Sequence, residues 1–314
     1  MKKAGAVTVT LNPAIDQTLS IPGFAAGRVN RVIGSRTDAG GKGVNVACVL
    51  ADLGVGVAAT GFLGRENVEP FETVFARKGI ADHFVRVPGS TRTGIKIVDG
   101  RTGQTTDINF PGLTPRTEDL AELFERTDAL VGPDAWLVLG GSVPPGVADS
   151  VYAAMIELIH RRGGRVLLDT SGAPLREALA GAPEIVKPNV EELGELVGRT
   201  LETPADVRAA AESMLGRGVR LVVVSMGAEG AVFIDRERSL LARPPRVPVR
   251  GTAGAGDAMA AGIVYGRIHG LPLEDLARVA TAAGACAVTR IGPGIEDRSM
   301  YRKLIEQVEI EPLP

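Results

Sequence analysis

Features that mark several other protein classes are scarce or missing in this sequence of 314 residues. Aromatic residues make up only 4% of the chain, too few for the stacking platforms that bind single-stranded nucleic acid. The formal net charge of −2 at pH 7 offers no basic excess to nucleic acid or to an anionic membrane. We therefore expect neither nucleic acid nor a membrane among its partners.

Cysteines and long apolar runs are also scarce. Cys48 and Cys286 lie far apart without a CxxC partner, so we expect two buried, reduced thiols. No uninterrupted run of about 18 apolar residues occurs, so no membrane-spanning helix is predicted. The apolar run at residues 6–11 ends in Asn12-Pro13, which is typical of a first strand and not of a signal peptide. A cytoplasmic location is the default expectation.

Two common nucleotide-binding fingerprints are missing as well. The chain contains no GxxxxGK[ST] loop, and no GxGxxG follows its first apolar run, which disfavours a dinucleotide oxidoreductase. Glycine itself is abundant, with 40 residues, many of them at junctions between apolar runs and helical segments. Ligand-binding turns of α/β folds occur at such junctions.

Short apolar runs alternate with helical patterns along most of the chain, which predicts an α/β fold with a parallel sheet buried on both faces. The predicted strands are residues 7–11, 57–61, 135–139, 166–169, 185–187, 221–225 and 231–234. The predicted helices are residues 44–53, 70–78, 117–127, 147–161, 204–215, 254–269, 272–289 and 297–306. No linker or internal repeat divides the chain, so we expect one domain over residues 1–314.

Two segments interrupt this alternation. Residues 18–37 and 91–110 carry alternating patterns with turn signals but no convincing helix, and the second is typical of a hairpin. We expect the two excursions to meet as a small β-sheet that forms a lid over the carboxyl edge of the main sheet.

The stretch Gly254-Ala255-Gly256-Asp257 precedes a helix of small residues. A helix N-terminus presents unpaired N–H groups and partial positive charge, and glycine allows a ligand close to the backbone. Such a turn suits the charge that develops on a transferred phosphoryl group, and Asp257 would accept the proton of an attacking hydroxyl. The alternative is that Asp257 only caps the helix and the glycines relieve crowding.

Five motifs then follow one another in a particular order. They are TLNPAID at residues 10–16, GGKGVNVA at 40–47, LGGSVPPG at 139–146, KPN at 187–189 with Glu192, and GTAGAGD at 251–257. Together they resemble the PfkB, or ribokinase-like, family of carbohydrate kinases over residues 7–306. With TRTGIKI at residues 91–97, the set looks most like the branch of fructose-1-phosphate kinases.

The resemblance implies a three-layer α/β/α ribokinase-like core with a small β-sheet lid, ATP with Mg²⁺ as donor, and a homodimer through the lid. It makes Asp257 the catalytic base and the backbone of Gly254, Ala255 and Gly256 the anion hole. In the family's pattern an aspartate that helps to hold a monovalent cation often stands where Gly251 stands here. Its absence leaves a requirement for potassium open.

The acceptor side of the implied site draws on the first two motifs. Asp16 would accept hydrogen bonds from sugar hydroxyls, and the alternative is a turn residue of the Asx type. Gly41, Lys42 and Asn45 open a helix and are assigned to the substrate, with Lys42 adding a point charge. The alternative for these residues is a structural glycine turn.

Two further residues are assigned to the acceptor. Arg92 in the lid offers a bidentate grip on the sugar's phosphate, and the alternative is a solvated hairpin arginine. Ser142 either meets the substrate or caps the helix that is expected to begin near residue 147.

The donor side is assigned to the later motifs. Asn189 and Glu192 would hold Mg²⁺ through water, and the same pair suits a helix cap with Glu at the third helical position. The residues that would line the nucleotide are Lys187, Asn189, Ser225, Met226, Gly227, Ala228, Glu229, Gly230, Thr252 and Gly256, with the helix at 282–287.

The sequence thus predicts a kinase that transfers the γ-phosphoryl group of ATP to a small-molecule sugar phosphate, fructose 1-phosphate first among the candidates. Tagatose 6-phosphate or fructose 6-phosphate as acceptor, and a sugar-phosphate sensor that has lost turnover, stay open as alternatives. A dinucleotide oxidoreductase is the least favoured.

Overall fold

The computed structural model describes residues 5–290, 292 and 294–313. Its main sheet is formed by strands β15 (Glu309–Pro312), β14 (Ser239–Arg243), β13 (Ala231–Ile234), β12 (Leu221–Ser225), β11 (Ile185–Val186), β10 (Arg165–Asp169), β9 (Trp136–Gly140), β1 (Ala6–Thr10), β4 (Val57–Gly64) and β5 (Ala81–Asp82), in that spatial order. Strand β6 (Val85–Val87) also pairs with β4. The strands from β5 to β12 run parallel, and β12 to β15 pair antiparallel.

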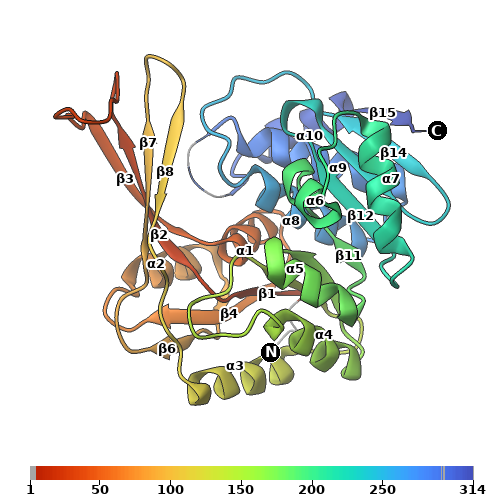
Figure 1. Cartoon of the computed structure of the whole chain (residues 1–314), viewed down its shortest axis with the longest axis horizontal. Coiled ribbons are helices and arrows are strands. Elements are labelled where there is room, and N and C mark those ends of the chain that lie inside the picture. The colour runs from red at the N-terminus through yellow and green to blue at the C-terminus, as the bar shows by residue number, and fades with distance from the viewer. Residues whose placement is uncertain (1–4, 291, 293, 314) are drawn as a thin grey trace.

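Helices cover both faces of this sheet (Figure 1). One face carries α1 (Lys42–Asp52), α2 (Glu69–Lys78), α8 (Ala255–Ile268), α9 (Leu273–Ala287) and α10 (Arg298–Gln307). The other carries α3 (Thr117–Leu130), α4 (Val151–Arg161), α5 (Gly172–Ala178), α6 (Val190–Val197) and α7 (Pro204–Leu215). Two short 3₁₀ turns, η1 (Leu179–Gly181) and η2 (Gly227–Glu229), complete the helical segments of the described residues.

Each face has its own apolar core. Along β9, Val138 points into the core beneath α1 and α8, whereas Leu137 and Leu139 point into the core beneath α3 and α4. Burying such a side chain completely contributes about 1.5–3 kcal/mol, so a strand apolar on both faces is stable only between two helical layers. The predicted three-layer α/β/α core is confirmed.

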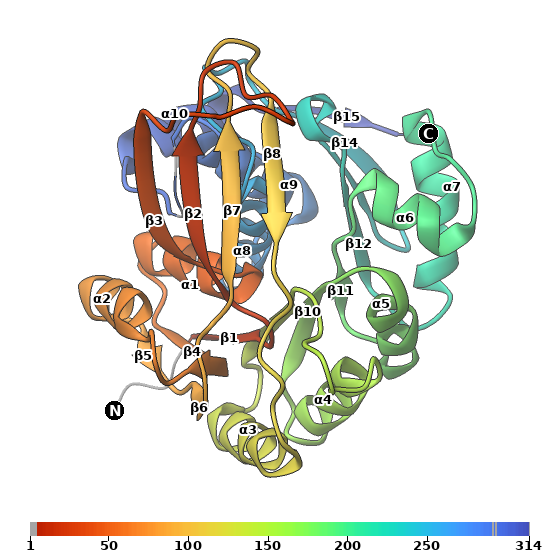
Figure 2. The ribbon, with the colours of Figure 1, turned by 60° about the vertical axis from the view of Figure 1, so that its left-hand side comes forward.

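The lid is a second sheet that stands away from the core (Figures 1 and 2). Its spatial order is β3 (Gly34–Gly40), β2 (Ala14–Ser20), β7 (Thr93–Val98) and β8 (Thr105–Asn109). The outer pairs are antiparallel, and β2 and β7 run parallel, which joins the two predicted excursions into one sheet. The first excursion begins at Ala14, earlier than expected, so Asp16 lies in a strand and its alternative as a turn residue is wrong.

Other expectations need correction at the element ends. Helix α4 begins at Val151, not near residue 147, because residues 144–147 form a turn closed by the Val147 N–H and the Pro144 carbonyl. Ser142 therefore does not cap it. Strands β5, β6, β14 and β15 and helix α5 were not predicted. Cys48 and Cys286 are buried and free, as expected. Across the described residues, no helix has the length and apolarity needed to span a bilayer.

Candidate active site at the carboxyl edge of the sheet

The predicted site residues follow parallel strands whose carboxyl ends lie side by side. Asp169 ends β10, Lys187 follows β11, and the lid and α1 follow β1. Helices α1 and α8 lie against each other near this edge, and their first turns meet there (Figure 1). Two helix N-termini at one point favour a negatively charged ligand.

Asp257 lies in the first turn of α8. Gly254, the residue before this helix, has a φ of +82°, a left-handed conformation that glycine adopts without strain. The Asp257 side chain is buried, and its Oδ2 accepts a 2.7 Å hydrogen bond from Asn45 Nδ2 on α1. Burial and then the nearby Asp169 raise the pKa of Asp257, while Lys42 and Asn45 oppose the rise. Asp257 is thus part of an inter-helix contact and not merely a cap.

Asp169 is a site residue that the sequence reasoning missed. Its carboxylate is fully buried and ion-pairs with two lysines, Lys42 at 2.6 Å and Lys187 at 3.1 Å. Burial alone would raise the pKa of Asp169, but the two ammonium charges hold it below its usual range. An aspartate at the end of a buried apolar strand was the available signal.

Lys42 lies in the middle of these charges. Its Nζ is also 3.8 Å from Glu192 Oε1. Burial alone would lower the pKa of Lys42, but the charges of Asp169 and Glu192 raise it above its usual value. Lys187 lies on the other side, where a Cβ added to Gly256 would come within 3.3 Å of its Nζ. The structure thus brings a lysine from the GGKG motif and one from the KPN motif to a single carboxylate.

Asp16 lies on the lid between two glycines. A Cβ added to Gly40 would come within 2.5 Å of Asp16 Oδ2, and one added to Gly94 within 2.7 Å of Oδ1. Both neighbouring strands therefore need glycine for the carboxylate to lie across them. Lys96 of β7, also missed by the sequence reasoning, ion-pairs with Asp16 at 2.8 Å. Both side chains are about one-quarter exposed, at 23% and 24%, so a ligand has access to the pair.

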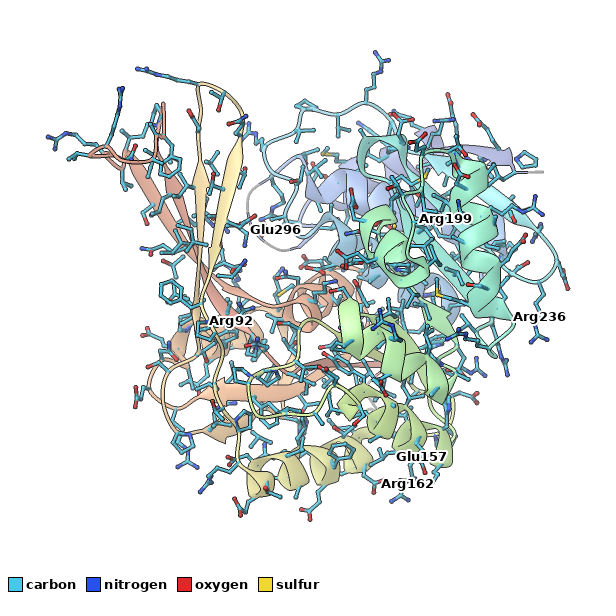
Figure 3. All side chains as sticks on the ribbon, viewed as in Figure 1. Arg92, Glu157, Arg162, Arg199, Arg236 and Glu296 are labelled. Carbon is cyan, nitrogen blue, oxygen red and sulfur yellow. The ribbon has the colours of Figure 1, made fainter. Side chains whose placement is uncertain are left out.

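Arg92 lies at the base of the lid (Figure 3). Its guanidinium donates to the carbonyls of Asn12, Pro13 and Phe110 at 3.2–3.3 Å. It is half-buried and not a solvated hairpin arginine, and burial lowers its pKa. Asn12 in turn donates a 3.0 Å hydrogen bond to Ser142 Oγ, so Arg92 and Ser142 are joined through one residue.

Asn189 and Glu192 form the expected capping box of α6. Asn189 Oδ1 accepts from the Glu192 N–H at 2.7 Å, and Glu192 Oε2 accepts from the Asn189 N–H at 2.9 Å. This arrangement leaves Glu192 Oε1 outside the cap. Within the described ranges, no group of three or more His, Cys, Asp or Glu residues is arranged to hold a metal directly.

A cavity of about 1060 Å³ opens next to these groups. Its lining includes Asn189, Thr252, Gly256 and the whole loop of residues 225–230. Thr281, Gly284 and Ala285 of α9 close one wall, and Pro244, Pro245 and Val247 lie on another. The nucleotide-side residues assigned from sequence therefore surround one space, except Lys187, which lies beside the lining residue Gly256.

Comparisons with known proteins agree with this arrangement. The family model described as "pfkB family carbohydrate kinase" matches residues 5–299. The chain is 48% identical to a 1-phosphofructokinase of Rhodobacter capsulatus over 98% of both chains, and 46% identical to one of Xanthomonas campestris over 90% of both. Phosphofructokinase-2 of Escherichia coli, solved in complex with fructose-6-phosphate, superposes with a TM-score of 0.87 at 29% identity, covering 97% of this chain and 99% of that chain. Another structure of that enzyme is its tetrameric inhibited form.

Proposed function

We propose that this chain, which belongs to the pfkB family of carbohydrate kinases and is a fructose-phosphate kinase, uses ATP to convert fructose 1-phosphate into fructose 1,6-bisphosphate. The observation that carries the proposal is the position of Asp257. It is a buried carboxylate, oriented by Asn45, in the first turn of a helix that borders a nucleotide-sized cavity.

The proposed reaction is a single displacement. Asp257 accepts the proton of the C6 hydroxyl as that oxygen attacks the γ-phosphorus of ATP. The bond between the γ-phosphorus and the β–γ bridging oxygen breaks, and ADP leaves with the electron pair. The N–H groups at Gly254–Gly256 and the ammonium groups of Lys42 and Lys187 lie where charge develops on the transferred group, which is where fixed dipoles lower the barrier most.

Mg²⁺ fits the oxygen donors on the nucleotide side. Glu192 Oε1 stays free of the capping box, and Asn189 lines the nucleotide cavity. We assign Asn189 and Glu192 to the ion through water, which accords with the preference of Mg²⁺ for keeping several waters. When bound with ATP, the ion would neutralise charge on the donor phosphates.

Acceptor recognition is assigned to the lid and its base. Asp16 would accept hydrogen bonds from sugar hydroxyls, and Arg92 would bind the phosphate already on the sugar. The supporting observation for Arg92 is that its described hydrogen bonds all go to carbonyl oxygens, which do not neutralise its positive charge. Ser142, whose hydroxyl oxygen accepts a hydrogen bond from Asn12, would also contact the sugar.

The isomer of the acceptor is tested by ADP release from Mg-ATP with fructose 1-phosphate, fructose 6-phosphate and tagatose 6-phosphate side by side. We expect kcat/KM for fructose 1-phosphate to exceed the other two by at least about 10-fold, about 1.4 kcal/mol in transition-state binding. Preference for fructose 6-phosphate, the ligand of the E. coli structure, would make that sugar the substrate.

We also propose a homodimer through the lid, in the cytoplasm where ATP is available. Val29, Val32 and Ile33 in the loop between β2 and β3 are exposed, as are Ile108 and Phe110 at the end of β8. An apolar patch of this kind favours burial against a second copy. Light scattering of the wild type and of Ile33→Asp tests the dimer, which the variant should dissociate.

A further inference from the structure

The unassigned carboxylate of Asp169 occupies the centre of the site. It ends β10 and is 1% exposed, and its neighbours on the sheet edge are Gly140 and the residues after Val186. The backbone around it is fixed, because the Asp169 carbonyl accepts from the Gly141 N–H at 3.0 Å and Thr170 Oγ1 donates to the Gly141 carbonyl at 2.9 Å. The carboxylate therefore has a defined place.

The two lysines on this carboxylate come from opposite sides of the site. Lys42 starts α1, the helix whose Asn45 holds Asp257, so its ammonium lies on the side of the attacking hydroxyl. Lys187 precedes Asn189 and lies against Gly256, both of which line the nucleotide cavity. Each lysine packs against a glycine, which has no side chain to crowd it. A Cβ added to Gly140 would come within 3.3 Å of Lys42 Cβ, and one added to Gly256 within 3.3 Å of Lys187 Nζ.

Two neighbouring ammonium groups repel each other, and an anion shared between them offsets that repulsion. A plain structural ion pair would need only one lysine. Here the Lys42 side chain remains 33% exposed, so its ammonium has donors left for a ligand after it has bonded to Asp169. The arrangement holds two cations on one carboxylate, one from α1 and one from the segment after β11.

We propose that Asp169 is a positioning residue that holds Lys42 and Lys187 on either side of the phosphoryl group in transfer. This inference rests on the proposed kinase reaction and adds to it an acidic residue with a role distinct from that of the base. Asp169 itself contacts neither the proton nor the phosphoryl group, and it acts only through the two lysines.

The test is a mutational cycle with Mg-ATP and fructose 1-phosphate. Asp169→Asn should lower kcat by about 10²–10³-fold, in the range for loss of preorganised charge stabilisation, with a much smaller change in the KM for ATP. In a Lys42→Met/Lys187→Met background, the same Asp169→Asn change should cost less than about threefold further, because residues acting as one unit are not additive. A further loss of tenfold or more in that background would overturn the proposal, since Asp169 would then act on its own.

Asp169→Glu keeps the proposal testable if the Asp169→Asn variant does not fold. It retains the charge but moves the carboxylate by one methylene, so we expect a folded protein with kcat lowered at least about 10-fold. Wild-type kcat in this variant would mean that the charge alone suffices, which would overturn the positioning role.

Asp119→Asn is the matched control. Asp119 is also a buried aspartate held by a cation, Arg116, but it lies in α3, away from the site. Its loss should lower the melting temperature without changing kcat. If the wild type itself does not turn over fructose 1-phosphate, the proposed function and this inference both fail. A normal wild type with an unaffected Asp169→Asn variant contradicts the role of Asp169 alone.

Discussion

Asn45 of α1 donates a 2.7 Å hydrogen bond to the Asp257 carboxylate of α8, which joins residues from motifs more than 200 positions apart at the start of two helices. The bond orients the carboxylate and favours its ionised form against the burial that raises its pKa. Both effects matter for a residue that must be ionised to accept a proton.

The first prediction concerns this bond. Asn45→Ala removes the donor, so the pKa of Asp257 should rise further and the acid limb of the kcat/KM profile should move to higher pH by about one unit. The measurement is initial-rate kinetics from pH 5.5 to 9. An acid limb at the wild-type position would show that the hydrogen bond does not act on the ionisation of the base.

The second prediction concerns stability. The folded-state pKa of Asp257 is raised above its unfolded value, so its ionisation above that pKa destabilises the fold. Asp257→Asn removes the buried charge, so the melting temperature of the variant at pH 8 should exceed that of the wild type by on the order of 2 °C or more. As the pH falls below the folded pKa, the difference should shrink, and it should vanish below the unfolded pKa, where Asp257 is protonated in both states. A lower melting temperature for the variant at pH 8 would contradict the account of Asp257 as a buried, strained charge.

The third prediction concerns the glycines beside Asp16. Gly94→Ala would place a Cβ within 2.7 Å of the Asp16 carboxylate and force it to move. Misplacement of a binding group by about 1 Å can cost on the order of 100-fold, so kcat/KM for the sugar phosphate should fall at least about 10-fold. Gly100→Ala in the same hairpin is the control, because nothing lies within 4 Å of its added Cβ. Equal activity of the two variants would exclude a role for the precise position of Asp16.

The fourth prediction concerns Lys96, whose ammonium lies 2.8 Å from Asp16 on the lid. An accessible cation beside the sugar-binding carboxylate should contribute to binding of the phosphorylated acceptor. Lys96→Met should raise the KM for fructose 1-phosphate about 10-fold or more with kcat nearly unchanged. Lys96→Arg keeps the positive charge, so its KM should be close to that of the wild type. Lys303→Met, which removes an exposed charge on α10, should leave both parameters unchanged.

Much of the core could be predicted from sequence because its strands are apolar on both faces and its helices are amphipathic. Val57 to Gly61 and Leu221 to Ser225 were predicted as strands for this reason, and both are strands. Strands β14 and β15, the last two at one end of the sheet, lack such a long apolar run, and they are held by pairing with a strand already in the sheet. That pairing is a tertiary feature that the local pattern does not encode.

The site shows the same division. Asp257, Asn45, Lys42 and Asn189 lie in motifs at helix starts, where the chemistry can be inferred from local sequence. Asp169 and Lys96 were missed because their partners, Lys42 and Asp16, are 127 and 80 residues away in the chain. Only the order of strands in the sheet and the parallel pairing of β2 with β7 bring these residues together.

The most direct test of the account is the turnover of Asp257→Asn with Mg-ATP and fructose 1-phosphate, measured by ADP release at pH 8. A general base contributes about 10²–10⁴-fold, so kcat should fall at least about 100-fold in a protein that is folded and still binds ATP. A variant that retains kcat within about tenfold of the wild type would contradict the assignment of Asp257 as the base.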